Sequence, residues 1–141
     1  MGYLLAHSVK ALTTRLLENF SEAGHNLTKA QWFILAKLYH FSERNLLQSE
    51  VVEMMLGDKT QVTRAVDDLV KREWIKQEID QNDRRNRVLT LTKQGKLVVP
   101  ELMQSVHKTL HEMTQNIKQS ELETTKKVLN QIIENSKNIN Q

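Results

Sequence analysis

Apolar side chains recur at helical spacing over the first part of the chain. Between residues 3 and 22 they stand three or four positions apart and share one helix face: Leu5, Val9, Leu12, Leu16 and Phe20. Thr28 and Gln31 then form a capping box, which predicts the start of a second helix. That helix is expected to end near residues 41–42 and to be buried on most sides, because of its apolar run: Trp32, Phe33, Ile34, Leu35, Leu38 and Tyr39.

A short helix and a longer one follow, with Gly57 between them. The pattern predicts them at residues 48–56 and 59–73, with Asp58 as the N-cap of the longer helix and Gln61 completing a capping box. The longer helix is amphipathic. Its predicted buried positions are Val62, Val66, Leu69 and Val70, and its polar face holds Thr60, Gln61, Thr63, Arg64, Asp67 and Asp68.

After residue 73 the spacing of apolar positions changes from that of helices to that of two β-strands, and it later returns to helical spacing. Residues 74–79 and 88–91 are expected to be strands, joined by a turn at residues 81–87. Thr92 caps a long helix that Pro100 is expected to kink or restart, because an interior proline costs roughly 3 kcal/mol. Ser120 and Glu123 predict a capping box for a last helix. The fold class is therefore mainly α with a small β-hairpin.

This order of elements is that of a winged helix-turn-helix. Its second helix fits the DNA major groove and presents its N-terminal side chains to base edges. Arginine pairs with guanine, glutamine pairs with adenine, and threonine contacts the thymine methyl or a phosphate. The predicted recognition residues are Lys59, Thr60, Gln61, Thr63 and Arg64.

Composition places the chain among folded, non-membrane proteins. Its 141 residues suit a single domain, with 39% hydrophobic and 26% charged residues. No apolar run approaches the roughly 20 residues of a membrane span. The absence of cysteine excludes disulfides and thiolate metal sites, and a cytoplasmic location is expected.

The positive charge is concentrated at the hairpin. The net charge is only +3, yet residues 71–96 hold eight basic and four acidic residues, and residues 84–96 hold five basic residues and no acidic one. Such clustering is expected for a protein with a polyanionic partner.

The hairpin also carries a specific signature: Asp83, Arg85, Leu91, Thr92 and Gly95. This Asp-x-Arg followed by an alternating strand and Leu-Thr-x-x-Gly resembles the wing of the MarR family of transcriptional regulators. The segments GYLLAHSVKALTTRLL, LTKAQWFILAKL and QSEVVEMMLGDKTQVTRAVDDLVKREWI resemble the family's first four helices. The resemblance implies a winged-helix lobe at about residues 27–98 and dimerisation helices at about residues 1–26 and 99–141.

The resemblance also implies the roles of the site residues. Arg85 is expected to enter the minor groove with Asp83 orienting it, and the full set of wing residues is Asp83, Arg84, Arg85 and Arg87. Three positions depart from the family pattern. Leu47 stands where a Ser or Thr cap is common, Gly57 stands in place of a small β-branched residue, and Glu73 replaces the glycine of the helix end, which predicts a C-cap without the usual left-handed residue.

The function expected is that of a homodimeric repressor that binds a palindromic double-stranded DNA operator without a cofactor. The family often binds small anionic or phenolic effectors, and the residues expected to line such a pocket are His7, Arg15 and Trp32. An enzyme is not expected, because the chain has no nucleophile elbow, Walker loop or GxGxxG motif.

Three alternatives remain open. Winged helices also serve as protein–protein interaction modules that do not bind specific DNA. The terminal helices could form a monomeric cap over the winged helix instead of a dimer interface. His107 and His111 stand at metal-ligand spacing, with Glu112 or His25 as an imaginable third ligand, although no metal site is predicted.

Overall fold

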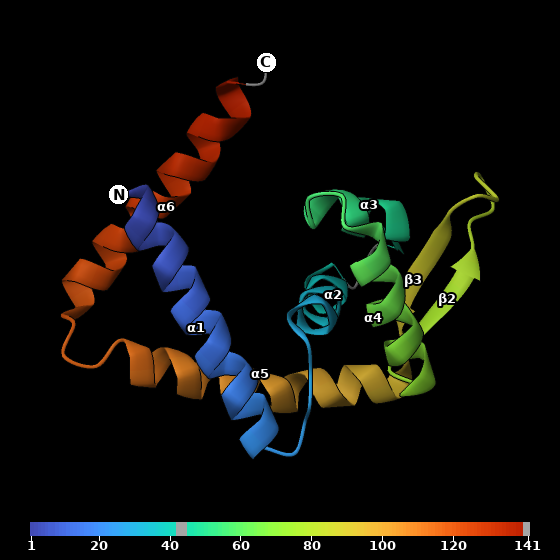
Figure 1. The fold of residues 1–141 in the computed structure, drawn as a ribbon, viewed down its shortest axis with the longest axis horizontal. Helices are drawn as coiled ribbons and strands as arrows, with labels where there is room; N and C mark the ends of the chain where they lie inside the picture. Colours follow the sequence, from blue (N-terminus) through green and yellow to red (C-terminus); the bar gives the residue numbers. More distant parts are fainter. Residues whose placement is uncertain (42–44, 140–141) are drawn as a thin grey trace. The chain divides into compact units, whose positions relative to one another are not determined.

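The computed structural model of the chain describes residues 1–41 and 45–139, and the helices and strands follow one another as Figure 1 shows. In order they are α1 (Gly2–Glu22), α2 (Lys29–His40), β1 (Leu46–Leu47), α3 (Gln48–Met54), α4 (Lys59–Lys71), β2 (Ile75–Ile79), β3 (Arg87–Leu91), α5 (Lys93–Met113) and α6 (Gln119–Ile139). This architecture confirms the predicted mainly α fold with a small hairpin. The chain divides into two compact units, Met1–Thr109 and Leu110–Gln141.

Helix α2 begins at the predicted capping box. The Thr28 hydroxyl accepts the Gln31 N–H at 3.2 Å, and the Gln31 side chain accepts the Thr28 N–H at 3.0 Å. The helix buries Ile34, Leu35 and Leu38 but leaves Tyr39 44% exposed, so it is buried on fewer sides than the sequence indicated. It ends at His40 with Phe41 as its C-cap. Residue 42, the other predicted end point, lies outside the described residues.

Helices α3 and α4 form the helix-turn-helix. Helix α3 ends two residues earlier than the sequence indicated, because the backbone turns into the left-handed region at Leu56 (φ 58°) and Gly57 (φ 82°). Helix α4 buries Val62, Ala65, Val66 and Leu69. The expectation that Val70 is buried was wrong, since this side chain is 37% exposed.

The C-terminal end of α4 has the left-handed residue that the sequence was expected to lack. Glu73 has φ 60°, and its N–H donates to the Val70 carbonyl at 2.9 Å. The N–H of Trp74 donates to the Leu69 carbonyl at 3.1 Å, which completes a Schellman motif. The expectation of an irregular C-cap was therefore wrong, and glutamate occupies the glycine conformation.

The hairpin belongs to a three-stranded antiparallel sheet with the order β1-β3-β2. Strands β2 and β3 pair from Ile75↔Leu91 at the base to Ile79↔Arg87 near the tip. The sequence did not predict β1, which pairs Leu46 with Leu89 and Leu47 with Val88. This short strand joins the start of the helix-turn-helix to the hairpin.

The core of the first unit lies where α1, α2, α4, the sheet and α5 meet. Its largest fully buried side chains come from all of these elements and include Phe20, Ile34, Leu35, Leu46, Leu69, Leu89 and Leu102. Burial of each such side chain stabilises the fold by roughly 1.5–3 kcal/mol. This shared core joins the helix-turn-helix to the strands of the hairpin.

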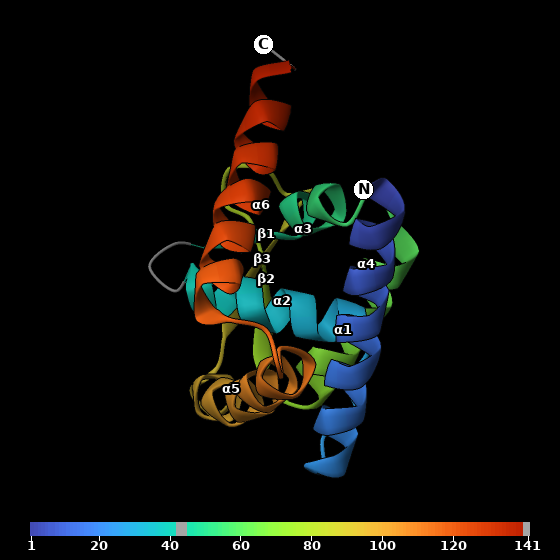
Figure 2. The same ribbon diagram turned by 90° about the vertical axis from the view of Figure 1, so that its left-hand side faces the viewer.

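Helix α1 crosses α5 within the first unit (Figure 1 and Figure 2). Asn19 donates to the Thr109 hydroxyl at 2.8 Å, and Lys108 pairs with Glu22 at 2.8 Å. Arg15 reaches Glu22 as well, at 3.3 Å. Hydrogen bonds from Lys108 and Arg15 hold the pKa of the Glu22 carboxyl below its usual range.

Helix α5 starts as predicted, since the Thr92 hydroxyl accepts the Gly95 N–H at 3.0 Å. The helix continues through Pro100 without a restart. Within the described residues, no helix is both long and apolar enough to span a membrane.

The second unit contains α6. The predicted capping box of Ser120 and Glu123 was wrong, because α6 begins at Gln119 and the Lys118 N–H donates to the Glu121 carboxylate at 3.0 Å. The N-cap is therefore Lys118, two residues before Ser120, because the Glu121 carboxylate and not that of Glu123 accepts the N-cap N–H. Helix α6 has no buried residue, and most of its large apolar side chains are exposed, including Val128, Leu129, Ile132 and Ile133.

Candidate nucleic-acid interface

The N-terminal turns of α4 present the predicted recognition side chains to solvent. Lys59, Thr60, Gln61, Thr63 and Arg64 are all exposed, because the opposite face of the helix is packed into the core. The Thr63 hydroxyl donates to the Lys59 carbonyl at 2.8 Å, and as a donor it can still accept a hydrogen bond from an external group.

Half of the capping box predicted for α4 is present. The Asp58 carboxylate accepts the Gln61 N–H at 3.0 Å. The reciprocal bond does not form, because the Asp58 N–H donates instead to the Met55 carbonyl at 3.4 Å. The Gln61 side-chain amide is therefore left without a hydrogen-bond partner among the described residues and is available to an external group.

The tip of the wing is shaped by carboxylates. Asp80 accepts the Asp83 N–H at 3.2 Å, and Asp83 accepts the Arg85 N–H at 3.0 Å. Asp83 thus orients Arg85 through its backbone amide rather than through the guanidinium. The Arg84 and Arg85 side chains are exposed.

The Arg87 side chain is more restrained by contacts within the chain than those of Arg84 and Arg85. It is partly buried, and its guanidinium donates to the carbonyls of Arg84 at 3.4 Å and Asn86 at 3.3 Å. Arg87 therefore braces the turn while its remaining N–H groups stay available. The positive charge of Arg87 remains at the wing whether its N–H groups donate within the turn or to an external group.

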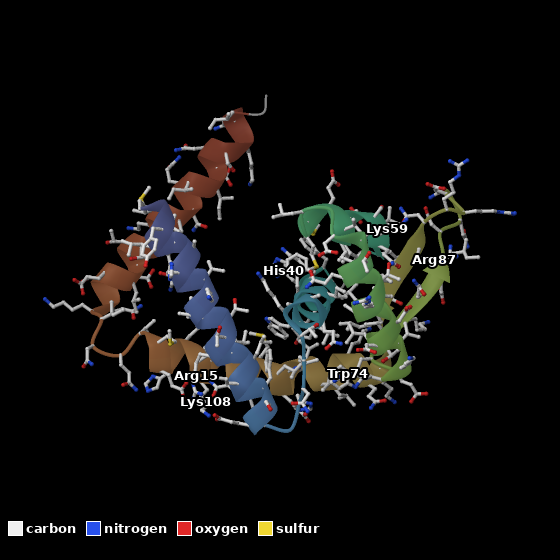
Figure 3. All side chains as sticks on the ribbon, in the orientation of Figure 1. Arg15, His40, Lys59, Trp74, Arg87 and Lys108 are labelled. Carbon is white, nitrogen blue, oxygen red and sulfur yellow. The ribbon has the colours of Figure 1, made fainter. Side chains whose placement is uncertain are left out.

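Helix α4, the predicted recognition helix, and the wing meet at one hollow of about 350 Å³. Its lining includes Lys59 from the start of α4 and Arg85 and Arg87 from the wing, with Asp83 as its carboxylate. Figure 3 shows Lys59 and Arg87 on the side where α3 and the wing come together. Three cations face one open hollow, which suits a polyanion such as a nucleic-acid backbone.

A second hollow, of about 460 Å³, lies on the other flank of α4. Thr60, Gln61 and Arg64 line it together with Gln31 and Asp68, and the Gln31 amide donates to Asp68 at 3.0 Å. The predicted recognition residues are therefore divided between two flanks of the helix. Lys59 lies on the flank of the wing, and Gln61 and Arg64 lie on the flank of α2.

Sequence reasoning missed Asn86, which joins the wing to α3. Its side chain donates to the Ser49 hydroxyl at 2.6 Å and accepts the Ser49 N–H at 3.3 Å. The partners are 37 positions apart in the sequence, so no local pattern could have indicated the contact. The unpredicted strand β1 was the missing signal, because it brings the start of α3 against the hairpin.

The residues predicted to line an effector pocket lie apart within one chain. His7 stacks on Tyr3 with ring centroids 4.1 Å apart, whereas the Trp32 ring lies 5.1 Å from that of Phe20. Arg15 is eight positions from His7 on α1, which is about 12 Å along a helix axis. The effector pocket stays a prediction.

The histidines with metal-ligand spacing are exposed on α5. His25, considered as a further ligand, instead lies 3.5 Å from the Glu101 carboxylate. In the part of the chain that the structure describes, no three His, Cys, Asp or Glu side chains are grouped so that they could hold a metal ion.

Comparison with solved structures identifies the fold. MarR from Escherichia coli, as a cysteine-to-serine mutant, superposes with a TM-score of 0.80 at 23% identity, covering 94% of this chain and 96% of that one. The same mutant in complex with operator DNA gives a TM-score of 0.75 at 23% identity, covering 93% and 91%. A MarR transcriptional regulator from Methanosarcina mazei gives 0.83 at 19% identity, covering 98% and 96%.

Sequence comparison leads to the same family. The transcriptional repressor MprA of Escherichia coli K12 is 29% identical over 126 residues, which are 88% of this chain and 69% of that protein. A sequence model of the MarR family matches residues 25–86, the segment that contains the helix-turn-helix and most of the wing. Residues 25–86 therefore match the MarR family of transcriptional regulators, and the chain is similar to MarR-family proteins in sequence and fold.

Proposed function

We propose that the chain is a sequence-specific double-stranded DNA-binding regulator that acts in the cytoplasm as a homodimeric repressor. The observation that supports this function best is the hollow shared by Lys59 of the recognition helix and by Arg85 and Arg87 of the wing. An exposed polar helix face and a basic hairpin within one compact unit fit the major groove and the neighbouring minor groove. The similarity to MarR-family regulators supports a DNA-binding regulator rather than an enzyme.

The recognition helix and the wing have different roles in this proposal. Gln61 and Arg64 read base edges in the major groove, where the pattern of donors and acceptors is unique for each base pair. Lys59, Thr60 and Thr63 contact phosphates or thymine methyl groups. Arg84, Arg85 and Arg87 contact phosphates and the minor groove, which is narrow and strongly negative in A·T-rich DNA. Asp83 keeps Arg85 in place through its backbone amide.

Repression and dimerisation are supported by the relatives and by the exposed surface. MprA is a transcriptional repressor, and the Escherichia coli MarR mutant was solved with operator DNA. Residues 1–26 and 99–141 carry the dimer interface in this proposal, and residues 27–98 form the DNA-binding lobe. A two-fold dimer matches a palindromic operator. A small effector that relieves repression would bind near His7, Arg15 and Trp32.

Selection of bound sequences from a random duplex pool tests this function. We expect enrichment of a palindrome whose half-sites lie about one helical turn apart. We also expect the affinity to fall steeply as salt concentration rises, because phosphate contacts release counterions. A pool that shows no enrichment would favour the alternative of a winged-helix protein interaction module.

A further inference from the structure

The side chain of Asn86 joins two elements that the proposed function requires to act together. Its Nδ2 group donates to the Ser49 hydroxyl of α3 at 2.6 Å. Its Oδ1 atom accepts two N–H groups, that of Ser49 at 3.3 Å and that of Arg87 at 2.9 Å. One amide therefore bonds both to the first turn of α3 and to the strand that carries the wing.

Helix α3 needs this contact because its own N-cap lacks a polar side chain. The first N–H groups of a helix have no intrahelical partner, and an N-cap Ser, Thr, Asp or Asn normally accepts one of them. Leu47 occupies the N-cap and has no acceptor, although the Glu50 carboxylate satisfies the Leu47 N–H at 2.8 Å. Asn86 supplies the missing acceptor from the wing.

Asn86 also closes the wing turn through its backbone. Its N–H donates to the Asp83 carbonyl at 2.9 Å, and its carbonyl accepts the Asp80 N–H at 3.2 Å. The last strand pair is Ile79↔Arg87, so the turn at residues 80–86 projects beyond the sheet. Among the described residues, the hydrogen bonds that join this turn to the helix-turn-helix are those between Asn86 and Ser49.

We propose that Asn86 is a positioning residue that caps α3 from the wing and thereby holds Arg85 beside the recognition helix before DNA binds. Asn86 precedes Arg87, follows Arg85, and lines the hollow that both arginines share with Lys59. A wing without this attachment has to be ordered when the complex forms, and the conformational freedom given up at that point lowers the affinity. The inference rests on the proposed DNA-binding function.

Asn86→Ala tests the attachment first in the free protein. We expect amide hydrogen exchange to rise about tenfold or more at residues 81–87 and at Ser49, because both ends of the contact open. Asn82→Ala is the matched control, since Asn82 is an exposed asparagine of the same turn whose side chain makes no hydrogen bond within the described residues. Unchanged exchange in Asn86→Ala would overturn the inference.

DNA binding tests the positioning role. Asn86→Ala should weaken binding to the selected operator about fivefold to tenfold, whereas Asn82→Ala should bind like the parent. Asn86→Asp keeps the acceptor for Ser49 and Arg87 and should recover part of the affinity. Ser49→Ala removes only the hydroxyl and should have an intermediate effect. If Asn86→Ala does not fold, the operator affinities of Asn86→Asp and Ser49→Ala test the positioning role instead.

A double-mutant cycle with Arg85 separates positioning from general loss of stability. If Asn86 acts by placing Arg85, Asn86→Ala should have little further effect in an Arg85→Ala background. An equal loss of affinity in both backgrounds would contradict the proposal. If the parent selects no DNA sequence, the proposed function fails, and hydrogen exchange in the free chain still decides whether Asn86 attaches the wing.

Discussion

Glu73 ends the recognition helix in a conformation that favours glycine. Its φ of 60° brings Cβ close to the following carbonyl, which costs an L-residue roughly 1–2 kcal/mol. The two Schellman hydrogen bonds hold the backbone there nonetheless. The carboxylate at this position is exposed.

Glu73→Gly should therefore stabilise the protein. The relief of strain exceeds the entropy that a new glycine adds to the unfolded chain, so we expect about 0.5–1 kcal/mol more stability. Urea unfolding monitored by circular dichroism measures this difference. Glu73→Ala removes the charge but keeps the strain, so it should not stabilise. Equal stability of the Gly and Ala variants would argue against strain at this position.

Gly95 shows the opposite case, a glycine that is required by close packing. A Cβ built at this position would lie 2.0 Å from the carbonyl oxygen of Trp74, which is backbone and cannot rotate away. Gly95→Ala should therefore separate α5 from the start of β2 and destabilise the fold by about 2 kcal/mol or more. Gly2→Ala is the control, because nothing lies within 4 Å of the added methyl. Thermal melting should show a large loss only for the first variant.

The wing and the recognition helix are expected to contact different parts of the DNA, so substitutions in each should have different effects on binding. Arg85→Ala should weaken binding to operator and scrambled duplexes alike and reduce the salt dependence by about one unit of slope for each phosphate that is no longer neutralised. Arg64→Ala should instead cost roughly 1–3 kcal/mol on the operator and relax the preference at one position per half-site. Fluorescence anisotropy across a salt series measures both effects.

Two controls support this comparison. Asp83→Ala should resemble a milder form of Arg85→Ala, because it removes the carboxylate that holds the Arg85 N–H and leaves the guanidinium present. Lys126→Ala removes a cation from α6, far from the wing in sequence, and should leave the affinity unchanged. If Arg85→Ala binds both duplexes as the parent does, the wing does not contact DNA.

The helices and the hairpin were predictable because their signals are local. The capping box of Thr28 and Gln31 lies within four positions, and the apolar face of α4 repeats every three or four residues. Strand β1 was not predictable, since two leucines carry no period and their partners, Leu89 and Val88, lie elsewhere in the chain. The contact between Asn86 and Ser49 was not predictable either, because the two residues are 37 positions apart. The exposed polar face of α4 was predictable from the sequence, and the attachment of the wing to α3 was not.

At the scale of the whole molecule, the described parts of α1 and α6 expose many large apolar side chains. Large apolar side chains are uncovered on the N-terminal part of α1 and along α6: Tyr3, Leu4, Val9, Val128, Leu129, Ile132 and Ile133. Exposed apolar surface of this extent marks protein interfaces. In a closed two-fold dimer the same helices of both copies would cover it, which would place two recognition helices on one duplex.

Substitutions on α6 test this assembly. Light scattering of the parent at micromolar concentration should give twice the 16.4 kDa of one chain. Leu129→Glu and Ile133→Glu should shift the mass towards that of the monomer, because a buried unpaired charge opposes association. Asn130→Glu adds the same charge at a polar position of α6 and should remain dimeric. The monomeric variants should lose affinity for a palindromic operator while binding a single half-site as the parent does, since each recognition helix is intact. A parent that keeps the monomer mass at high concentration would refute the dimer.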